Sequence, residues 1–346
     1  MKNKKSFMTI GIVILIVLIG SFVFYYNGIS ATSSQDEEVI VHIEEGSHAS
    51  IILDELDDAG LVKNKLCGKI YLKLNHFSHL EANTYVFNKN MSLPEIFSII
   101  ENPDFDHIVK LKITIKEGNT MREVAESFAE ILNISSEEVI KEWADKDYLK
   151  SLIDDYWFID ESILDDQLLY PLEGYLFPET YFVTEKNPTV ASVTKLSLDM
   201  MDKKLSAYKE QIEKLKWTPH QFLTFASIVE RESLFDEDRP MIAGVFMNRL
   251  KDGKKLESDI TVNYALQKTG VKVTYSQLQT DSKYNTYKYT GLPIGPISTV
   301  SEVTMEACLH PTQHNYFFFF ADKEGKVYYS QTYAQHEETV KEHKWY

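Results

Sequence analysis

The fold of this chain is decided by residues 218–250, which read Thr-Pro-His-Gln-Phe-Leu-Thr-Phe-Ala-Ser-Ile-Val-Glu-Arg-Glu-Ser over 218–233 and Asp-Arg-Pro-Met-Ile-Ala-Gly-Val-Phe-Met-Asn-Arg-Leu over 238–250. Thr218 can cap a helix, Pro219 suits its first turn, and Gln221 completes a capping-box pattern. Apolar residues then recur at helical spacing over 222–229. This stretch is therefore predicted to be a helix with one apolar face.

Two glutamates near the end of the predicted helix are candidates for catalysis. At about 100° per residue, Glu230 and Glu232 fall on the two margins of the apolar face, whereas Arg231 points away from it. A carboxyl group at such an edge loses hydration, which raises its pKa and suits it to general-acid catalysis. Periodicity does not choose between the two glutamates. The alternative is that both are ordinary solvated residues near a helix end.

Length and composition bound the class of protein. The chain has 346 residues, of which 44% are hydrophobic, enough for one large core or a few smaller ones. Its net charge of −16 argues against a nucleic-acid partner, because phosphate binding needs clustered Lys and Arg. The two cysteines, Cys67 and Cys308, lie far apart and have no metal-ligand spacing around them. They are interpreted as buried free thiols, and neither a metal nor a cofactor is predicted.

The N-terminus has the composition of a membrane anchor. Lysines at positions 2, 4 and 5 precede an uncharged, largely apolar run over residues 6–26. About 20 apolar residues suffice to span a bilayer as a helix. A single-pass transmembrane helix is predicted at 7–26, and the positive-inside rule places residues 1–6 in the cytoplasm and the rest outside. A cleaved signal peptide is the alternative. In either case the body of the protein works outside the cytoplasmic membrane, where extracellular polymers are the expected substrates.

The rest of the chain is predicted to be an α+β protein in several parts. Residues 27–38 form a polar linker, and 39–108 form a small α+β domain. Residues 109–160 follow the order strand, Gly turn, helix, helix, which resembles the LysM domain, a glycan-binding βααβ module. The alternative for these two parts is a spacer without binding activity. A mixed α/β catalytic domain is assigned to residues 161–346.

Two irregular segments are candidates for substrate contacts. Residues 170–181 combine two prolines, a glycine, four aromatic residues and the carboxylates Glu173 and Glu179. Aromatic rings can stack on sugar faces and carboxylates can accept hydroxyl hydrogen bonds, although a buried irregular connection has the same composition. Residues 291–298 hold two glycines and two prolines, so their path is fixed rather than flexible.

Five distinctive blocks follow one another in the chain: Leu172–Tyr181, Ala226–Glu232, Val245–Leu250, Leu256–Asp259, and Tyr284–Tyr287 together with Gly291–Pro296. Together they resemble the YceG-like family of endolytic murein transglycosylases. The resemblance covers roughly residues 40 to 346. Tyr175 and Phe177 stand where tryptophan is common in the family, and Ile294 stands where proline is common. These departures remove no carboxylate.

The resemblance implies a reaction and a set of site residues. The expected activity is non-hydrolytic cleavage of the β-1,4 bond from N-acetylmuramic acid to N-acetylglucosamine within nascent peptidoglycan, which leaves 1,6-anhydro ends and terminates strand elongation. By the family match, Glu230 is the catalytic acid. Substrate-binding roles are expected for Glu173, Glu232, Asn248, Asp259, Tyr284, Asn285 and Thr286. Peptidoglycan synthases and division or elongation proteins are the expected protein partners.

Two other functions fit the same residues. One is a membrane-anchored glycan-binding scaffold of the cell-wall synthesis machinery that performs no chemistry. The other is a muramidase-type hydrolase, which needs a second carboxylate to place a water molecule or act as nucleophile. Glu232 or Asp259 could supply that carboxylate, so both readings stay open at the level of sequence.

Overall fold

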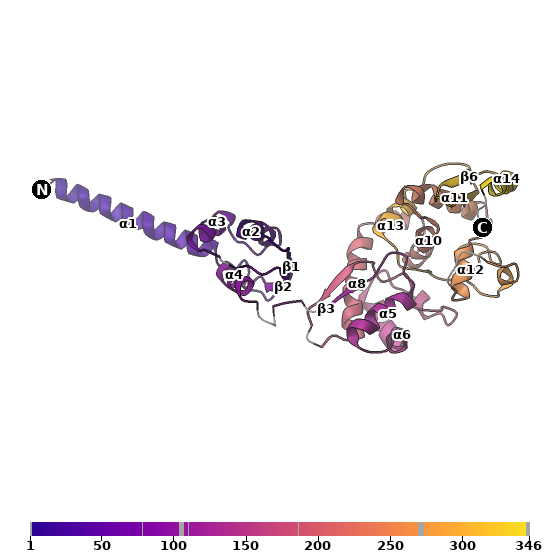
Figure 1. Cartoon of the computed structure of the whole chain (residues 1–346), viewed down its shortest axis with the longest axis horizontal. Helices are drawn as coiled ribbons and strands as arrows, with labels where there is room; N and C mark the ends of the chain where they lie inside the picture. Colours follow the sequence, from indigo (N-terminus) through magenta and orange to yellow (C-terminus); the bar gives the residue numbers. More distant parts are fainter. Residues whose placement is uncertain are drawn as a thin grey trace. The chain divides into compact units, whose positions relative to one another are not determined.

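The structure is a computed structural model that describes residues 2–77, 79–103, 107–109, 111–185, 187–268 and 273–343. It is a mixed α/β protein that divides into two compact units (Figure 1). The first unit comprises Met1–Leu111 with Phe182–Thr184, and the second comprises Lys112–Tyr181 with Glu185–Tyr346. The chain therefore passes from the second unit to the first and back at residues 182–184.

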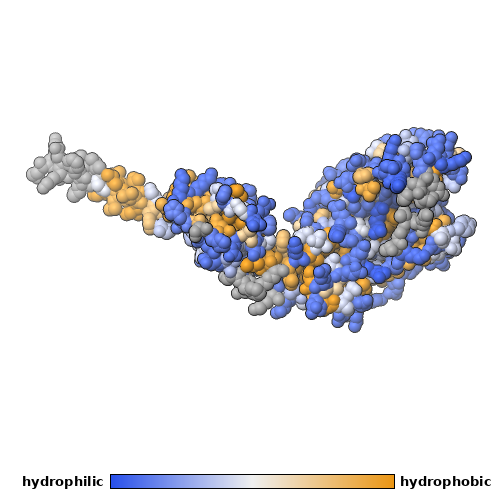
Figure 2. Space-filling model, viewed as in Figure 1, coloured by the Kyte–Doolittle hydropathy of each residue, from blue (hydrophilic) through white to orange (hydrophobic). Residues whose placement is uncertain are grey.

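The first helix is the predicted anchor. α1 runs from Lys2 to Gly28, and its segment Gly11–Gly28 has a mean hydropathy of 2.0. Among the described residues it is the one helix long and apolar enough to cross a membrane. Hydrophobic side chains are gathered along it without cover (Figure 2), and from Ile12 to Val17 each is more than half exposed. Such exposure is unfavourable in water, so α1 indicates a single-pass membrane anchor.

The first unit has its own small core. β1 (Glu38–Ile43) pairs antiparallel with β2 (Asn83–Asn88) in a register that sets Val41 opposite Tyr85. Three helices accompany the two strands: α2 (Ala49–Asp58), α3 (Lys65–Leu74) and α4 (Leu93–Glu101). Their apolar faces bury a cluster that includes Leu56, Phe87 and Phe97. Cys67 belongs to this cluster and is a free thiol, as predicted.

The second unit is largely helical. Its longer helices are α5 (Met121–Leu132), α6 (Ser136–Trp143), α7 (Lys146–Asp155), α8 (Val190–Ser206), α9 (Lys209–Lys214), α10 (Pro219–Glu232), α11 (Arg239–Lys251), α12 (Asp259–Ala265), α13 (Glu302–Leu309) and α14 (Tyr333–His343). Short 3-10 turns lie at Glu161–Leu164, Asp236–Asp238 and Gln277–Gln279. β5 (Phe318–Ala321) and β6 (Val327–Ser330) form the antiparallel hairpin predicted at the C-terminus.

α10 is the central helix of this unit. It has the predicted capping box, in which Thr218 Oγ1 accepts from the Gln221 backbone N–H and the Gln221 side chain accepts from the Thr218 backbone N–H. Every residue from Phe222 to Glu230 is buried, and α11, α12 and α13 all contact the helix. The helix is therefore surrounded on more than the single apolar face that periodicity predicts.

The segment that resembles LysM contains the predicted strand and helices. β3 (Leu111–Thr114) is followed by a turn at Lys116–Asn119 and then by α5 and α6. The partner strand of β3 is β4 (Thr180–Val183), which comes from the end of the aromatic segment 170–181. Ile115 donates its backbone N–H to Glu179 O at 3.0 Å. The strand–helix–helix–strand order thus closes only after residue 160.

Candidate active site

Glu230 is buried and fully engaged by other residues of the protein. Its side chain forms an ion pair with Arg239, whose Nη2 donates to Glu230 Oε1 at 2.9 Å. Oε2 accepts from the Ser301 backbone N–H at 2.9 Å, from Ser301 Oγ at 2.7 Å and from Thr304 Oγ1 at 2.6 Å. The residue is 6% exposed. Both oxygens of Glu230 therefore accept hydrogen bonds from other residues of the protein.

Glu232, the last residue of α10, is placed differently. It is half-buried, and its Oε1 accepts a hydrogen bond from Ser258 Oγ at 2.6 Å. Its Oε2 has no hydrogen-bond partner among the described residues and is not sealed from solvent. The pKa of Glu232 is raised to about 7, mainly because the carboxyl group is buried; the Ser258 hydrogen bond lowers the pKa and the nearby Asp259 carboxylate contributes to raising it. Glu232 thus combines an open oxygen with a pKa near neutrality.

A network of hydroxyl groups holds Ser258 beside Glu232. The Ser258 backbone N–H donates to Thr286 Oγ1 at 3.0 Å, and Thr286 Oγ1 lies 2.9 Å from Thr261 Oγ1. The next residue, Asp259, accepts a hydrogen bond from Tyr287 Oη at 2.6 Å. Segments 258–261 and 286–287 are therefore tied to each other at two points next to the end of α10.

Ser258 follows a residue in an unfavourable backbone conformation. Glu257 has a φ of 52°, which is uncommon for a residue with a side chain. Arg249 Nη1 secures this turn by donating to Lys255 O, Leu256 O and the Glu257 carboxylate at 2.9–3.0 Å. Backbone strain of this kind persists where surrounding contacts fix it, and it often marks functional sites. Arg249 therefore fixes the approach of Ser258 to Glu232.

Glu173 is a second unusual carboxyl group. It is 1% exposed, accepts from the Met121 backbone N–H at 2.9 Å and from Tyr264 Oη at 2.7 Å. Burial raises its pKa to about 8. It joins the start of α5 to α12, the helix that begins at Asp259. Both oxygens of Glu173 are therefore occupied by hydrogen bonds that link α5 to α12.

The Lys116–Asn119 turn closes one side of the end of α10. Arg231 Nη1 donates to Gly118 O at 2.9 Å. The Thr299 backbone N–H donates to Asn119 O, and Thr299 Oγ1 donates to Lys116 O, both at 2.8 Å. The turn between β3 and α5 is thus built into the neighbourhood of Glu230 and Glu232.

Other residues with predicted substrate contacts have internal partners. Asn248 Nδ2 donates to His314 O at 2.9 Å and to Tyr316 O at 3.0 Å, which fastens α11 to the segment before β5. Asn285 is buried, and its Nδ2 donates to Leu278 O and Thr280 O. Tyr284 is 1% exposed and packs on the Tyr264 ring. The structure brings Asp259 and Thr286 to Glu232, but uses Asn248, Tyr284 and Asn285 to hold loops in place.

Several residues that matter here were not predicted as site residues. Arg239, Ser301 and Thr304 determine the environment of Glu230. Ser258 and Tyr287, which lie within two of the family-like blocks, determine that of Glu232 and Asp259. The contacts from Ser258 and Ser301 span 26 and 71 residues of chain. Helical periodicity relates only residues that are close in the sequence, so it cannot predict these distant partners.

Comparisons with known proteins identify relatives over nearly the whole chain. Residues 41–342 match the model of the YceG-like family. An endolytic murein transglycosylase of Bacillus subtilis is 31% identical over 323 residues, which is 92% of this chain and 89% of that protein. One of Streptococcus pneumoniae is 34% identical over 321 residues, 88% of this chain but 58% of that longer protein. A crystal structure of a yceG-like protein of Listeria monocytogenes covers 88% of this chain and 100% of its own, with 33% identity and a TM-score of 0.64.

Proposed function

This chain belongs to the YceG-like family, and we infer from that membership that it is a lytic transglycosylase acting on peptidoglycan. We propose that it cuts within nascent glycan strands, at the β-1,4 bond from N-acetylmuramic acid to N-acetylglucosamine. The observation that supports a catalytic role is the half-buried Glu232 with one open oxygen and a pKa near 7. A scaffold without chemistry has no use for such a group.

We assign the catalytic acid to Glu232 in place of Glu230. A general acid needs an oxygen within hydrogen-bond reach of the leaving group and a pKa near the working pH. Glu232 offers both, whereas the oxygens of Glu230 are taken up by Arg239, Ser301 and Thr304. The role of Glu230 in this proposal is structural: it fixes the end of α10 and, through it, the position of Glu232.

The proposed reaction uses one carboxyl group twice. Glu232 first donates its proton to the glycosidic oxygen, and the bond from that oxygen to C1 of the muramyl residue breaks. The carboxylate that remains then takes the proton of the muramyl C6 hydroxyl while the C6 oxygen bonds to C1. The products are a 1,6-anhydro end and a free hydroxyl on the departing sugar. Water is not consumed, and Glu232 regains its starting proton.

Asp259 supports this reaction electrostatically. Positive charge develops at C1 as the bond breaks, and a nearby carboxylate stabilises such charge. The Asp259 carboxylate is held by Tyr287 Oη and also raises the pKa of Glu232. In a hydrolase, Asp259 would instead have to place a water molecule or attack C1. Its engagement with Tyr287 favours the electrostatic role.

Product analysis separates the candidate functions. Purified peptidoglycan strands are incubated with the protein and the fragments are analysed by mass spectrometry. The expected fragments end in 1,6-anhydro-N-acetylmuramic acid and are lighter than hydrolysis products by one water molecule. Reducing ends would establish a muramidase-type hydrolase, and intact strands would establish the scaffold. Peptide-free strands serve as the matched control for cleavage elsewhere than in the glycan.

We propose that the anchor holds this activity at the outer face of the cytoplasmic membrane. Lysines at positions 2, 4 and 5 precede the apolar segment of α1, so the N-terminus is proposed to be cytoplasmic and residues beyond 28 extracellular. Peptidoglycan synthases and division or elongation proteins are proposed neighbours, because nascent strands are made there. Protease added to intact cells freed of their wall should digest the region after residue 28. Full protection of that region would contradict the orientation.

The LysM-like segment is proposed to help position the catalytic residues at the end of α10. Its turn at Lys116–Asn119 bonds to Arg231 and Thr299, and its helix α5 begins at the backbone N–H that Glu173 accepts. These contacts support a role as a wall of the catalytic domain. We therefore propose that residues 112–160 position the end of α10 in addition to any glycan binding of their own.

A further inference from the structure

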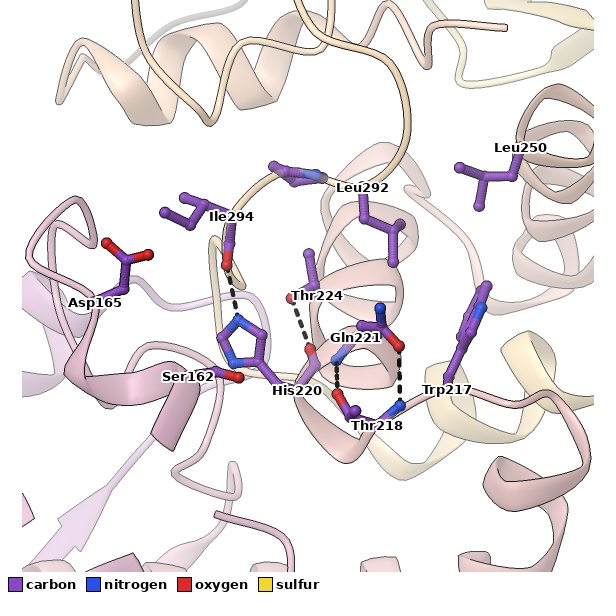
Figure 3. A pocket seen from close by; sticks show the side chains of 11 residues that line it. Ser162, Asp165, Trp217, Thr218, His220, Gln221, Thr224, Leu250, Leu292 and Ile294 are labelled. Atoms are coloured by element: carbon purple, nitrogen blue, oxygen red, sulfur yellow. Dashed lines mark hydrogen bonds between the residues drawn. The ribbon is translucent and has the colours of Figure 1, made fainter. Parts of the chain in front are cut away.

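A cavity of about 540 Å³ lies at the opposite end of α10 from Glu232. Its lining includes Ser162, Asp165, Trp217, Gln221, Thr224 and Leu250. Figure 3 shows Trp217 and Leu250 on one side, Ser162 and Asp165 on the other, and Gln221 and Thr224 of α10 between them. Its volume is that of a site for a small molecule or a few sugar residues. Neither Glu232 nor its hydrogen-bond partner Ser258 belongs to the lining.

Trp217 stands between this cavity and a second hollow. The second hollow has a volume of about 400 Å³ and shares Trp217 and Leu250 with the first. It continues along α11 past Gly244 and Met247 to the segment Pro311–Gln313. Trp217 is half-buried and its ring packs on Phe225, with ring centres 5.1 Å apart. The indole is therefore held in a fixed position with one side toward open space.

The lining combines this aromatic ring with polar groups that are mostly uncharged. Within the described part of the chain, neither Trp217 Nε1 nor Gln221 Nε2 has a hydrogen-bond partner, although Gln221 Oε1 accepts from the Thr218 backbone N–H. Ser162 is exposed and Asp165 offers an exposed carboxylate across the cavity. An aromatic platform with amide, hydroxyl and carboxylate groups around it suits a saccharide, whose ring faces are apolar and whose edges carry hydroxyl and acetamido groups.

The cavity and the proposed catalytic acid lie near the two ends of α10. Gln221 and Glu232 are eleven residues apart, which separates them by about 16 Å along the helix axis and by only about 20° around it. Between them, Phe225 and Ile228 are fully buried. The helix surface between the two sites is therefore covered by other parts of the protein, and the two sites are distinct. A strand that occupies both must span at least this distance of about 16 Å.

We propose that the cavity beside Trp217 is a second binding site, which holds the glycan strand several sugar residues away from the bond cleaved at Glu232. This inference rests on the proposed function, since it takes the strand as the ligand. An enzyme that cuts inside a strand gains from contacts far from the chain end. A short fragment occupies the site at Glu232 alone, and only a longer strand reaches both.

Binding of strands of different length to full-length protein tests the proposal. The Glu232→Gln protein is titrated calorimetrically with peptide-free GlcNAc–MurNAc strands and with the disaccharide, so cleavage does not interfere. Two further variants act on opposite walls of the cavity: Trp217→Ala removes the platform, and Ser162→Tyr fills the space from an exposed position. Each is expected to weaken binding of long strands about tenfold and to leave binding of the disaccharide unchanged. Trp157→Ala is the matched control, because Trp157 is 37% exposed and lies outside the cavity.

The outcomes distinguish this inference from the proposed function. Loss of long-strand binding in both cavity variants, with an unchanged Trp157→Ala protein and unchanged melting temperatures, supports the second site. Equal affinity of all variants for long strands would overturn it, even if the wild-type protein produces anhydro ends. An equal loss for the disaccharide would also overturn it, since the effect would not depend on length. If Trp217→Ala weakened the binding of peptide-bearing strands but not of peptide-free strands, the cavity would be a site for the peptide and the proposal would be overturned.

Discussion

Replacing Glu232 by glutamine is expected to reduce the rate of strand cleavage by at least about a hundredfold, the usual scale for loss of a general acid. Glutamine keeps the size of the side chain and can still accept the Ser258 hydrogen bond, so the fold and the binding of strands should persist. What it loses is the proton that the glycosidic oxygen requires. The measurement is the rate at which 1,6-anhydro ends appear, compared between equal amounts of folded wild-type and variant protein.

The pH dependence of the wild-type protein provides an independent check. A general acid must be protonated in the free enzyme, and the protonated fraction of Glu232 falls as pH rises through its pKa of about 7. The quotient kcat/KM should therefore decrease above about pH 7. Asp259→Asn should move this limb to lower pH, because the neighbouring negative charge raises the pKa of Glu232. A limb that does not move would contradict the proposed proximity of the two groups.

Glutamine at position 230 is expected to act on stability. Glu230→Gln removes the buried one of the two negative partners of Arg239 and leaves the guanidinium paired only with the largely exposed Asp236. Removing one partner of a buried ion pair costs up to about 3–5 kcal/mol of unfolding free energy. For a unit of this size that corresponds to a melting temperature lower by roughly 10 °C. Differential scanning calorimetry of the wild-type and variant proteins measures both quantities.

A surface pair supplies the control for Glu230. Asp147 pairs with Lys150 at 3.2 Å, and both side chains are more than half exposed. Asp147→Asn should change stability by less than about 1 kcal/mol, since solvent screens exposed pairs.

The two substitutions at α10 also decide the assignment of the acid. If folded Glu230→Gln protein were inactive while Glu232→Gln protein cleaved normally, Glu230 would be the acid and the present assignment would be wrong.

Sequence reasoning was most successful for features that depend on near neighbours. The apolar run in α1, the capping box at Thr218, and the C-terminal hairpin are all confirmed by the structure. Family membership was also readable, because five blocks in a fixed order are specific where one block is not. These features need no knowledge of which distant segments meet.

The surroundings of each glutamate at the end of α10 were decided only by the tertiary structure. The two residues are two positions apart in α10 and fall on the two margins of its apolar face, so periodicity does not distinguish them. Arg239, Ser301 and Thr304 enclose Glu230, whereas Ser258 meets Glu232 and leaves one oxygen open. The sequence by itself determined that carboxyl groups lie at the end of this helix, in a membrane-anchored protein of a family that acts on peptidoglycan. Which carboxyl group can release a proton depends on desolvation and hydrogen bonding, and both are properties of the surroundings that folding assembles.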